Sequence, residues 1–352
     1  MSRRRRLISN SLSVIGNQAA QNATSLVLNI AIARILGVYA LGQYNLAYTY
    51  YFIFMTIASN GFKVLFTREM ARKPESVKLY IVSGTALQLA FAAVVYIVLA
   101  GLVLLLPYED DTARVCLLVG LAIIPYSISN VTEAAFQAAE KMHIIAISTV
   151  PVYVVRLGVM IVLMAGGADV ESVALTLVLS EALIVAIEWL FALRLFGTVK
   201  WTLDWVFIRQ TVMQARTFVA IESIATFRSR IQTLILSLVA GEAVVGLYSA
   251  AMQLIRPFQL VATSVSLAVF PSLSKSRELS REQQQALTER AISVLLMLAL
   301  PLIVGFYFVG GPLLVAVYGD PAFGDTAGVL HILSLMMVAL ALTRNLSLVL
   351  VA

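Results

Sequence analysis

Hydrophobic residues fill most of this chain in long runs, and short polar stretches separate the runs. Because a helix needs about 20 mostly apolar residues to cross the hydrocarbon layer of a bilayer, each run is long enough to be a membrane-spanning helix. The pattern predicts an all-α, polytopic membrane protein with about ten such helices, at residues 10–36, 42–66, 79–106, 113–139, 143–165, 171–196, 217–240, 244–271, 290–311 and 326–352.

The composition supports this fold class and limits the chemistry. The 352 residues are 60% hydrophobic and only 12% charged, about half the charge of soluble domains. Cys116 is the one cysteine, which excludes an intrachain disulfide and a multi-cysteine metal site. With only two histidines, a His-rich metal centre is excluded too. We therefore expect no metal, no cofactor, no catalytic residues and no nucleic-acid partner, and we interpret the net charge of +6 as a signal of topology.

The segment after the first predicted helix recurs later in the chain. At an offset of 204 residues, four residues of the first segment coincide with identical residues of the second, namely Gly37, Gly42, Tyr44 and Ala47 with Gly241, Gly246, Tyr248 and Ala251. The offset also superimposes the apolar runs that follow, which predicts two tandem copies of one bundle around a central cavity. The predicted parts are a six-helix lobe at 1–196, a cytoplasmic amphipathic linker at 197–216 and a second lobe at 217–352. Since that second lobe has four helices, we expect a truncated chain, with a natural ten-helix protein as the alternative.

Basic residues predict the orientation. With the N-terminus in the cytoplasm, one side of the membrane carries seventeen Lys and Arg residues, whereas the other side carries Arg114 alone. This bias follows the positive-inside rule, so we expect an integral protein of the cell (inner) membrane with a cytoplasmic N-terminus.

Polar residues recur at helical spacing within several of the predicted spans. In the first helix they form one stripe that runs from Ser11 to Asn29, because their spacings of three, four and seven residues keep them on one face. We interpret the Asn and Gln members of these stripes as lining a water-filled cavity: Gln18, Asn22, Asn29, Asn45, Asn60, Asn130 and Gln253. Hydrogen bonds that hold the helices together are the alternative.

Ionised residues inside the spans carry the functional hypothesis. A charge at the bilayer centre costs about 2.5–3.5 kcal/mol and usually faces a bundle interior. Four arginines near mid-depth are the predicted site for an anionic head group, Arg230, Arg256, Arg228 and Arg156, because guanidinium grips phosphate oxygens and stays protonated. Four acids are candidates for ion coupling: Glu133, Glu181, Glu188 and Glu222.

Pairing, helix geometry and position along the helix limit these expectations. A structural ion pair between Arg156 and Glu181 is the other interpretation of those two residues. Arg228 and Arg230 lie 200° apart around their helix, so at most one of them faces the cavity squarely. Arg34, Lys63 and Arg344 are closer to helix ends, where we expect them to extend to the head groups.

Several short motifs follow one another along the chain: Ala31-x-Ala-Arg-Ile-Leu-Gly37, Gly42-Gln-Tyr44, Asn60-Gly61, Arg68-Glu69, Ala135-Phe-Gln137, Gly246-Leu-Tyr-Ser-Ala-Ala251, Phe270-Pro-Ser-Leu-Ser274, Pro301 and Tyr318-Gly319 with Phe323. In this order they resemble the polysaccharide-export flippases of the multidrug/oligosaccharidyl-lipid/polysaccharide exporter superfamily. The resemblance implies a flippase that moves undecaprenyl-pyrophosphate-linked glycans to the outer leaflet by alternating access through a cationic lumen. Membrane lipids and polysaccharide polymerase or glycosyltransferase machinery are the implied partners. Gln232 stands where many relatives carry an Asp, which puts a cation site at that position in doubt.

Other functions would leave different residues in the chain. A cation-coupled multidrug antiporter of the same superfamily needs acidic groups in its cavity, and the arginines argue against it. A membrane glycosyltransferase or polymerase needs catalytic carboxylates in an ordered loop, where only Asp320 and Asp325 qualify. A non-transporting scaffold has no need of ions at mid-depth.

Overall fold

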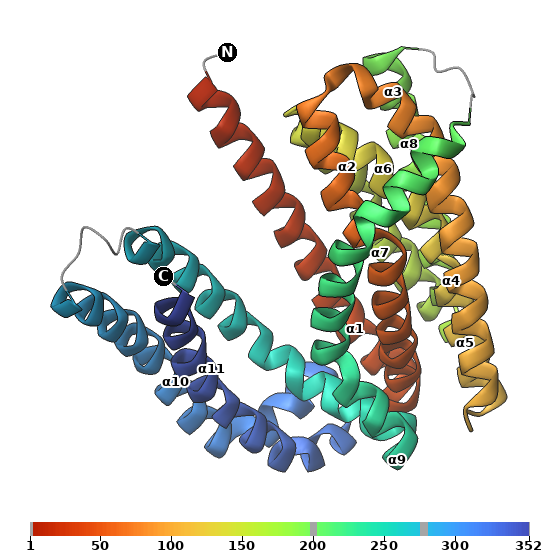
Figure 1. Ribbon diagram of the computed structural model, residues 1–352. Coiled ribbons are helices and arrows are strands. Elements are labelled where there is room, and N and C mark those ends of the chain that lie inside the picture. Colours follow the sequence, from red (N-terminus) through yellow and green to blue (C-terminus); the bar gives the residue numbers. More distant parts are fainter. Residues whose placement is uncertain (1–2, 198–202, 275–280, 352) are drawn as a thin grey trace. The chain divides into compact units, whose positions relative to one another are not determined.

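The computed structural model describes residues 3–197, 203–274 and 281–351, with side chains at 10, 12–197, 203–265, 286 and 288–343. Its elements are helices joined by short connections (Figure 1). The α-helices are α1 (Arg3–Met55), α2 (Gly61–Arg72), α3 (Val77–Leu79), α4 (Thr85–Leu105), α5 (Asp110–Leu121), α6 (Ile123–Ala138), α7 (Met142–Ala165), α8 (Val170–Phe196), α9 (Trp205–Ser274), α10 (Arg281–Tyr318) and α11 (Ala327–Val351). π-Helical turns at Thr56–Asn60 and Tyr80–Gly84 and 3-10 turns at Pro74–Ser76 and Pro321–Thr326 complete the order. The predicted all-α class is confirmed.

Within the described part of the chain, eight helical stretches are long and apolar enough to cross a membrane. Two of them, at 12–72 and 205–265, contain 61 residues each. A straight helix of that length would measure about 90 Å, roughly three times the hydrocarbon layer. Each of the two contains a glycine with a non-helical backbone, and division at that glycine gives the ten predicted crossings.

The two glycines stand at equivalent positions of the predicted repeat and have the same conformation. Gly37 has φ 87° and ψ −177°, and Gly241 has φ 79° and ψ 178°. Residues with a Cβ rarely adopt this region. Eight residues to either side of Gly37, Asn45 Nδ2 donates a hydrogen bond to Asn29 Oδ1 at 2.9 Å, so α1 folds back on itself there.

The described chain forms two compact units, residues 1–245 and 246–352. The first unit includes the beginning of α9, which packs directly on the second span. A Cβ built on Gly61 would lie 2.6 Å from Val219 Cα, so only glycine fits between these two backbones. The predicted boundary between the two copies, at 197–216, stays a prediction. Helix α9 begins at Trp205 inside the predicted linker, and residues 198–202 lie outside the described ones.

A chain of hydroxyl groups also ties the first part of α9 to the rest of the first unit. Tyr108 Oη is 2.9 Å from Tyr50 Oη and 2.9 Å from Ser237 Oγ. Burial raises the pKa of the Tyr108 phenol, which lies between the α4 and α5 spans, so this phenol remains protonated and available as a donor.

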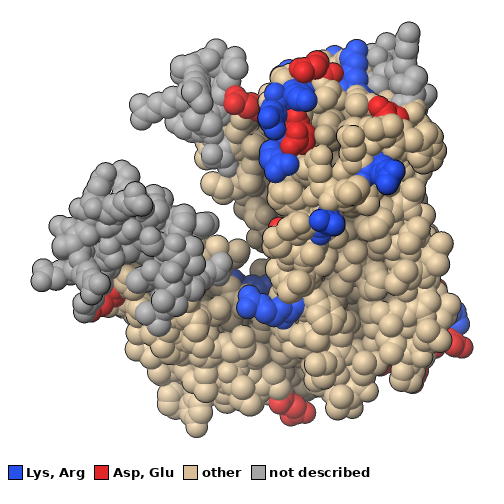
Figure 2. All heavy atoms as spheres, viewed as in Figure 1, with Lys and Arg blue, Asp and Glu red and all other residues tan. Residues whose placement is uncertain are grey.

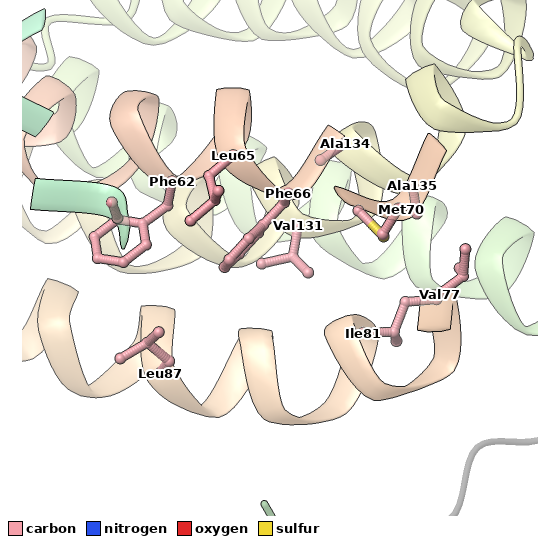
Figure 3. Packing of buried hydrophobic residues seen from close by; sticks show 11 residues of the cluster. Phe62, Leu65, Phe66, Met70, Val77, Ile81, Leu87, Val131, Ala134 and Ala135 are labelled. Atoms are coloured by element: carbon pink, nitrogen blue, oxygen red, sulfur yellow. The ribbon is translucent and has the colours of Figure 1, made fainter. Parts of the chain in front are cut away.

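The hydrophobic core near one end of the first unit joins α2, α4 and α6 (Figure 3). Phe62 packs against Phe91 with ring centroids 5.4 Å apart, and Phe66 packs against Tyr80 at 5.3 Å. Over the face that Figure 2 shows, most of the surface is uncharged, and Lys and Arg are most numerous near the top of the view. This distribution is typical of a protein whose middle lies in lipid.

Some predicted boundaries and breaks differ from the structure. The span predicted at 113–139 is two helices, α5 and α6, that meet at Ala122, because Pro125 has no N–H for the carbonyl of Leu121. Helix α10 is longer than the predicted 290–311. Helix α9 continues past Pro257 to Ser274, and its non-helical residue is Gly241.

In the second unit, the Tyr318 hydroxyl donates to the Ala250 carbonyl at 3.1 Å, and its ring stacks on Phe323 at 4.8 Å. His331 Nε2 lies 3.1 Å from the Phe306 carbonyl oxygen. Asp320 accepts from the Ala322 N–H at 2.9 Å, which caps the turn at Pro321–Thr326.

Candidate functional site

A polar cavity of about 250 Å³ lies within the first unit. Its walls come from α1, the π-helical turn at Thr56–Asn60, α6, α7 and α8. They consist of Gln18, Gln21, Tyr48, Tyr51, Phe52, Met55, Asn60, Tyr126, Tyr153, Arg156, Leu177 and Glu181. Four predicted site residues are thus brought together from four separate parts of the sequence: Gln18, Asn60, Arg156 and Glu181.

The two ions of this cavity form a pair. Arg156 Nη1 on α7 lies 3.0 Å from Glu181 Oε1 on α8 and 3.3 Å from Ser180 Oγ. The guanidinium also stacks on Tyr153, 4.9 Å from the ring centroid. The two side chains are only 14% and 10% exposed, and ions this deeply buried need a partner. The ion pair that the sequence left open as an alternative is therefore present, and the cavity carries no net charge from it.

The other predicted arginines lie elsewhere. Arg230 places its guanidinium carbon 4.5 Å from the ring centroid of Phe52, which is itself a wall of the cavity. Arg228 lines a separate apolar groove. This agrees with the expectation that at most one of the two faces the cavity. Arg256 belongs to the second unit, where its side chain is exposed.

Among the predicted lining amides outside the cavity wall, two hold helices together. Asn29 accepts from Asn45, and each also donates to a carbonyl one turn earlier in its own helix segment. Asn22 is exposed on α1, whereas Asn130 and Gln253 are buried. A cavity-lining role for these residues stays a prediction.

The remaining acids have three different environments. Glu133 pairs with Lys63, so the expectation that Lys63 extends to the head groups is wrong: a carboxylate on the neighbouring α6 is within its reach. Glu188 is fully buried on α8 and accepts from Ser129, Thr132 and Ser148 at 2.6, 2.7 and 3.3 Å. Glu222 is half-buried on α9. The side chains of Ser11 and Arg344, and those of Arg3 to Arg6, lie outside the described ones.

The aromatic wall of the cavity is what the sequence analysis missed. Tyr48, Tyr51 and Phe52 follow one another at helical spacing on the segment that also carries Asn45. This spacing places them on one face, and it could have been recognised beside the amide stripe. Phenol, amide and guanidinium groups around one cavity suit hydrogen bonding to a polar ligand. Among the described residues no group of three or more His, Cys, Asp and Glu could hold a metal ion.

Known structures share this fold. The chain is similar to a eukaryotic MATE transporter, AtDTX14, with a TM-score of 0.63 and 13% identity over 97% of this chain and 82% of that one. It is also similar to a MOP superfamily transporter from Pyrococcus furiosus, described as having a binding pocket of reverse polarity. The TM-score is 0.63 and the identity 15% over 98% of this chain and 81% of that one. A third similar structure is a multidrug resistance MATE family transporter in an inward-facing conformation. Its TM-score is 0.68, with 15% identity over 94% of this chain and 80% of that one. At these identities the likeness concerns the fold alone.

Sequence comparisons identify the family. A family model described as "Polysaccharide biosynthesis protein" matches residues 7–277, and one described as "Lipid II flippase MurJ" matches residues 208–352. The probable flippase AglR of Haloferax volcanii is 32% identical over 113 residues, which is 32% of this chain and 24% of AglR. The chain thus spans about a quarter of the curated relative it matches. The first model covers well over half of the chain, and together these matches confirm the resemblance to flippases: the chain belongs to the polysaccharide biosynthesis protein family.

Proposed function

We propose that this protein is a transporter that moves polyprenyl-pyrophosphate-linked oligosaccharides from the cytoplasmic to the outer leaflet by alternating access. The observation that carries the proposal is the charge balance of the cavity in the first unit. Its one lining acid, among the residues described there, is Glu181, and Arg156 neutralises it. A cavity without net charge suits neutral sugar hydroxyls, and among the residues described there it offers a cation no acid besides the paired Glu181.

Each part of the proposed substrate has matching side chains. The amides of Gln18, Gln21 and Asn60 and the phenol of Tyr126 can donate to and accept from sugar hydroxyl groups. Arg230, which stacks on the cavity-wall residue Phe52, supplies a guanidinium group for the pyrophosphate, and Arg256 remains a contact predicted from the sequence. The resemblance to polysaccharide-export flippases implies the polyprenyl carrier, and the relative AglR is a probable flippase.

A multidrug antiporter is the second candidate within the same fold. The MATE neighbours favour it by fold alone. It would need an acid in the cavity that is free to bind a cationic drug, and Glu181 is already paired. A glycosyltransferase or polymerase finds less support, because Asp320 has a structural role as a cap.

Glu188 is the strongest candidate for ion coupling among the four predicted acids. Glu133 and Glu181 are ion-paired, whereas the hydrogen bonds that Glu188 accepts from other described residues come from hydroxyl groups. A carboxyl group in this setting can bind a proton without losing an ionic partner. We further propose that the N-terminus is cytoplasmic and the membrane is the inner one, from the bias of the basic residues.

The test is transport of a lipid-linked oligosaccharide by the purified chain in liposomes. We expect Arg230→Gln and Arg256→Gln each to lower the initial rate by about tenfold or more, because each removes a charge-assisted contact to phosphate. Arg209→Gln, an exposed arginine near the start of the same helix, is the matched control and should transport normally. Full activity in both Arg230→Gln and Arg256→Gln would contradict the proposal, as would a preference for cationic drugs.

A further inference from the structure

An apolar groove of about 570 Å³ lies in the first unit, between the second span and α9. Ile53 and Ile57 form one wall, and Ile224, Phe227 and Ile231 form the other. The volume falls within the range of about 300–1,000 Å³ that small-molecule sites have. The groove is separate from the polar cavity described above.

Arg228 is the charged residue of this groove, among its described lining residues. Unlike Arg156, which pairs with Glu181, its exposed side chain makes no hydrogen bond or ion pair with any other residue that the structure describes. It lies about 20 Å along α9 from the bend at Gly241 and about 35 Å from the start of that helix. A guanidinium at this depth in a hydrocarbon layer about 30 Å thick is costly unless an anion pairs with it.

The groove and the cavity lie on two sides of one helical segment. Phe52 lines the cavity and stacks under Arg230, whereas Ile53 lines the groove. On α9 the same division separates Arg230 from Arg228, since two residues of a helix turn by about 200°. The polar cavity and the apolar groove are thus neighbours along the second span.

We propose that this groove binds the polyprenyl chain of the transported lipid, with Arg228 against its phosphate. The inference rests on the proposed function and adds a site for the carrier lipid. Charge and depth together select this occupant. The phosphates of ordinary phospholipids stay at the membrane surface, and only a lipid whose head group enters the layer brings phosphate to the depth of Arg228.

The experiment measures binding of geranylgeranyl diphosphate to the purified full chain in detergent micelles. Geranylgeraniol, which lacks the phosphates, and inorganic pyrophosphate, which lacks the chain, are the two reference probes. Ile224→Trp fills the groove from an exposed position, so the fold should tolerate it. Ile235→Trp is the matched control, exposed on the same helix and away from the groove.

We expect Ile224→Trp to weaken binding of geranylgeranyl diphosphate by about tenfold, because the chain loses its apolar surface, and to leave inorganic pyrophosphate unchanged. Arg228→Gln should weaken the diphosphate by a similar factor and leave geranylgeraniol unchanged. Ile235→Trp should bind all three probes as the unaltered chain does. Equal binding by Ile224→Trp, or equal competition by phosphatidylglycerol, would overturn the proposal and identify an ordinary lipid-facing groove.

Transport separates this inference from the function on which it rests. If Ile224→Trp flips a lipid-linked oligosaccharide at the normal rate, the groove proposal fails and the flippase proposal stands. If the unaltered chain binds geranylgeranyl diphosphate in the groove but flips no lipid-linked oligosaccharide, the substrate assignment fails and the lipid site stands.

Discussion

The two kinked helix pairs, at 10–72 and 205–274, share a bend but differ in the side chains around it. Gly37 and Gly241 have nearly identical backbone angles. At the same offset of 204, Gln18, Asn29, Asn45 and Phe52 of the first pair correspond to Glu222, Thr233, Ser249 and Arg256 of the second. The backbone of the repeat is thus kept while its chemistry changes from amides and an aromatic ring to ions and hydroxyls. Such a difference lets one framework offer hydrogen-bonding groups on one copy and charge on the other.

The largest expected effect comes from comparing Arg156, which is buried and ion-paired, with Arg256, which is exposed. Arg156→Gln should lower the free energy of unfolding by about 3–5 kcal/mol, because it leaves Glu181 buried without its partner. Arg256→Gln should change it by less than about 0.5 kcal/mol, because that side chain is exposed. Unfolding by denaturant in detergent micelles measures both. The double variant with Glu181→Gln should recover most of the stability lost by Arg156→Gln, and no recovery would contradict a simple pair.

The two bends should respond equally to the same substitution. We expect Gly37→Ala and Gly241→Ala each to cost about 1–3 kcal/mol, because the strain comes from the backbone angle and not from crowding. No neighbouring atom lies within 4 Å of a Cβ at either position. Thermal unfolding of the two variants measures the costs.

Gly16→Ala is the control for both bends. Gly16 lies inside α1 with equally open surroundings, so alanine there should stabilise the protein by about 0.5–1 kcal/mol. A large difference between Gly37→Ala and Gly241→Ala would show that the two bends are not equivalent.

Hydrogen bonding near the bend should matter more in the first copy. Asn45→Ala removes the bonds to Asn29 and to the Leu41 carbonyl, and we expect it to cost about 1–2 kcal/mol. Ser249→Ala, at the equivalent position, should cost less than about 0.5 kcal/mol. A double-mutant cycle of Asn29 and Asn45 measures their coupling, and a coupling near zero would mean that the bond across Gly37 adds nothing.

The smallest expected change in stability concerns Phe52, whose counterpart in the second copy is Arg256. Phe52→Leu should cost about 0.5–1 kcal/mol, because Arg230 loses its aromatic partner. Phe308→Leu, at an exposed ring on α10, is the control and should be nearly neutral. If Phe52→Leu and Phe308→Leu lower the free energy of unfolding by the same amount, the stacking of Arg230 contributes no stability.

The hydrophobic pattern was sufficient to predict the spans, because each must match the thickness of a bilayer. Helix α8 begins at Val170 against a predicted start at 171 and ends at the predicted Phe196. The predicted spans leave breaks at 37–41 and 241–243, and the two bends lie at Gly37 and Gly241, within these breaks. The length of α10 was underestimated, because helices continue past the apolar run where polar residues such as Arg281 are also good helix formers.

The residue types of the site could be predicted from the sequence, but the partner of each ionised side chain could not. The sequence identified Arg156 and Glu181 as ions at similar depth, and it could not decide whether they meet, because that depends on the rotation of α7 and α8 about their axes. The pairing of Lys63 with Glu133 was missed for the same reason. Helical spacing gives the face of one helix, whereas the neighbour of that face is set by packing between helices.

The close approach of Gly61 to Val219 has a consequence for how the chain could be made. Since backbone meets backbone there, the first stretch of α9 adheres to the preceding helices without help from the covalent connection before it. Two polypeptides, one ending at Gly197 and the other starting at Leu203, should therefore find each other when produced together. Copurification of the two fragments through a tag on either one would show this, and Gly61→Leu should prevent it.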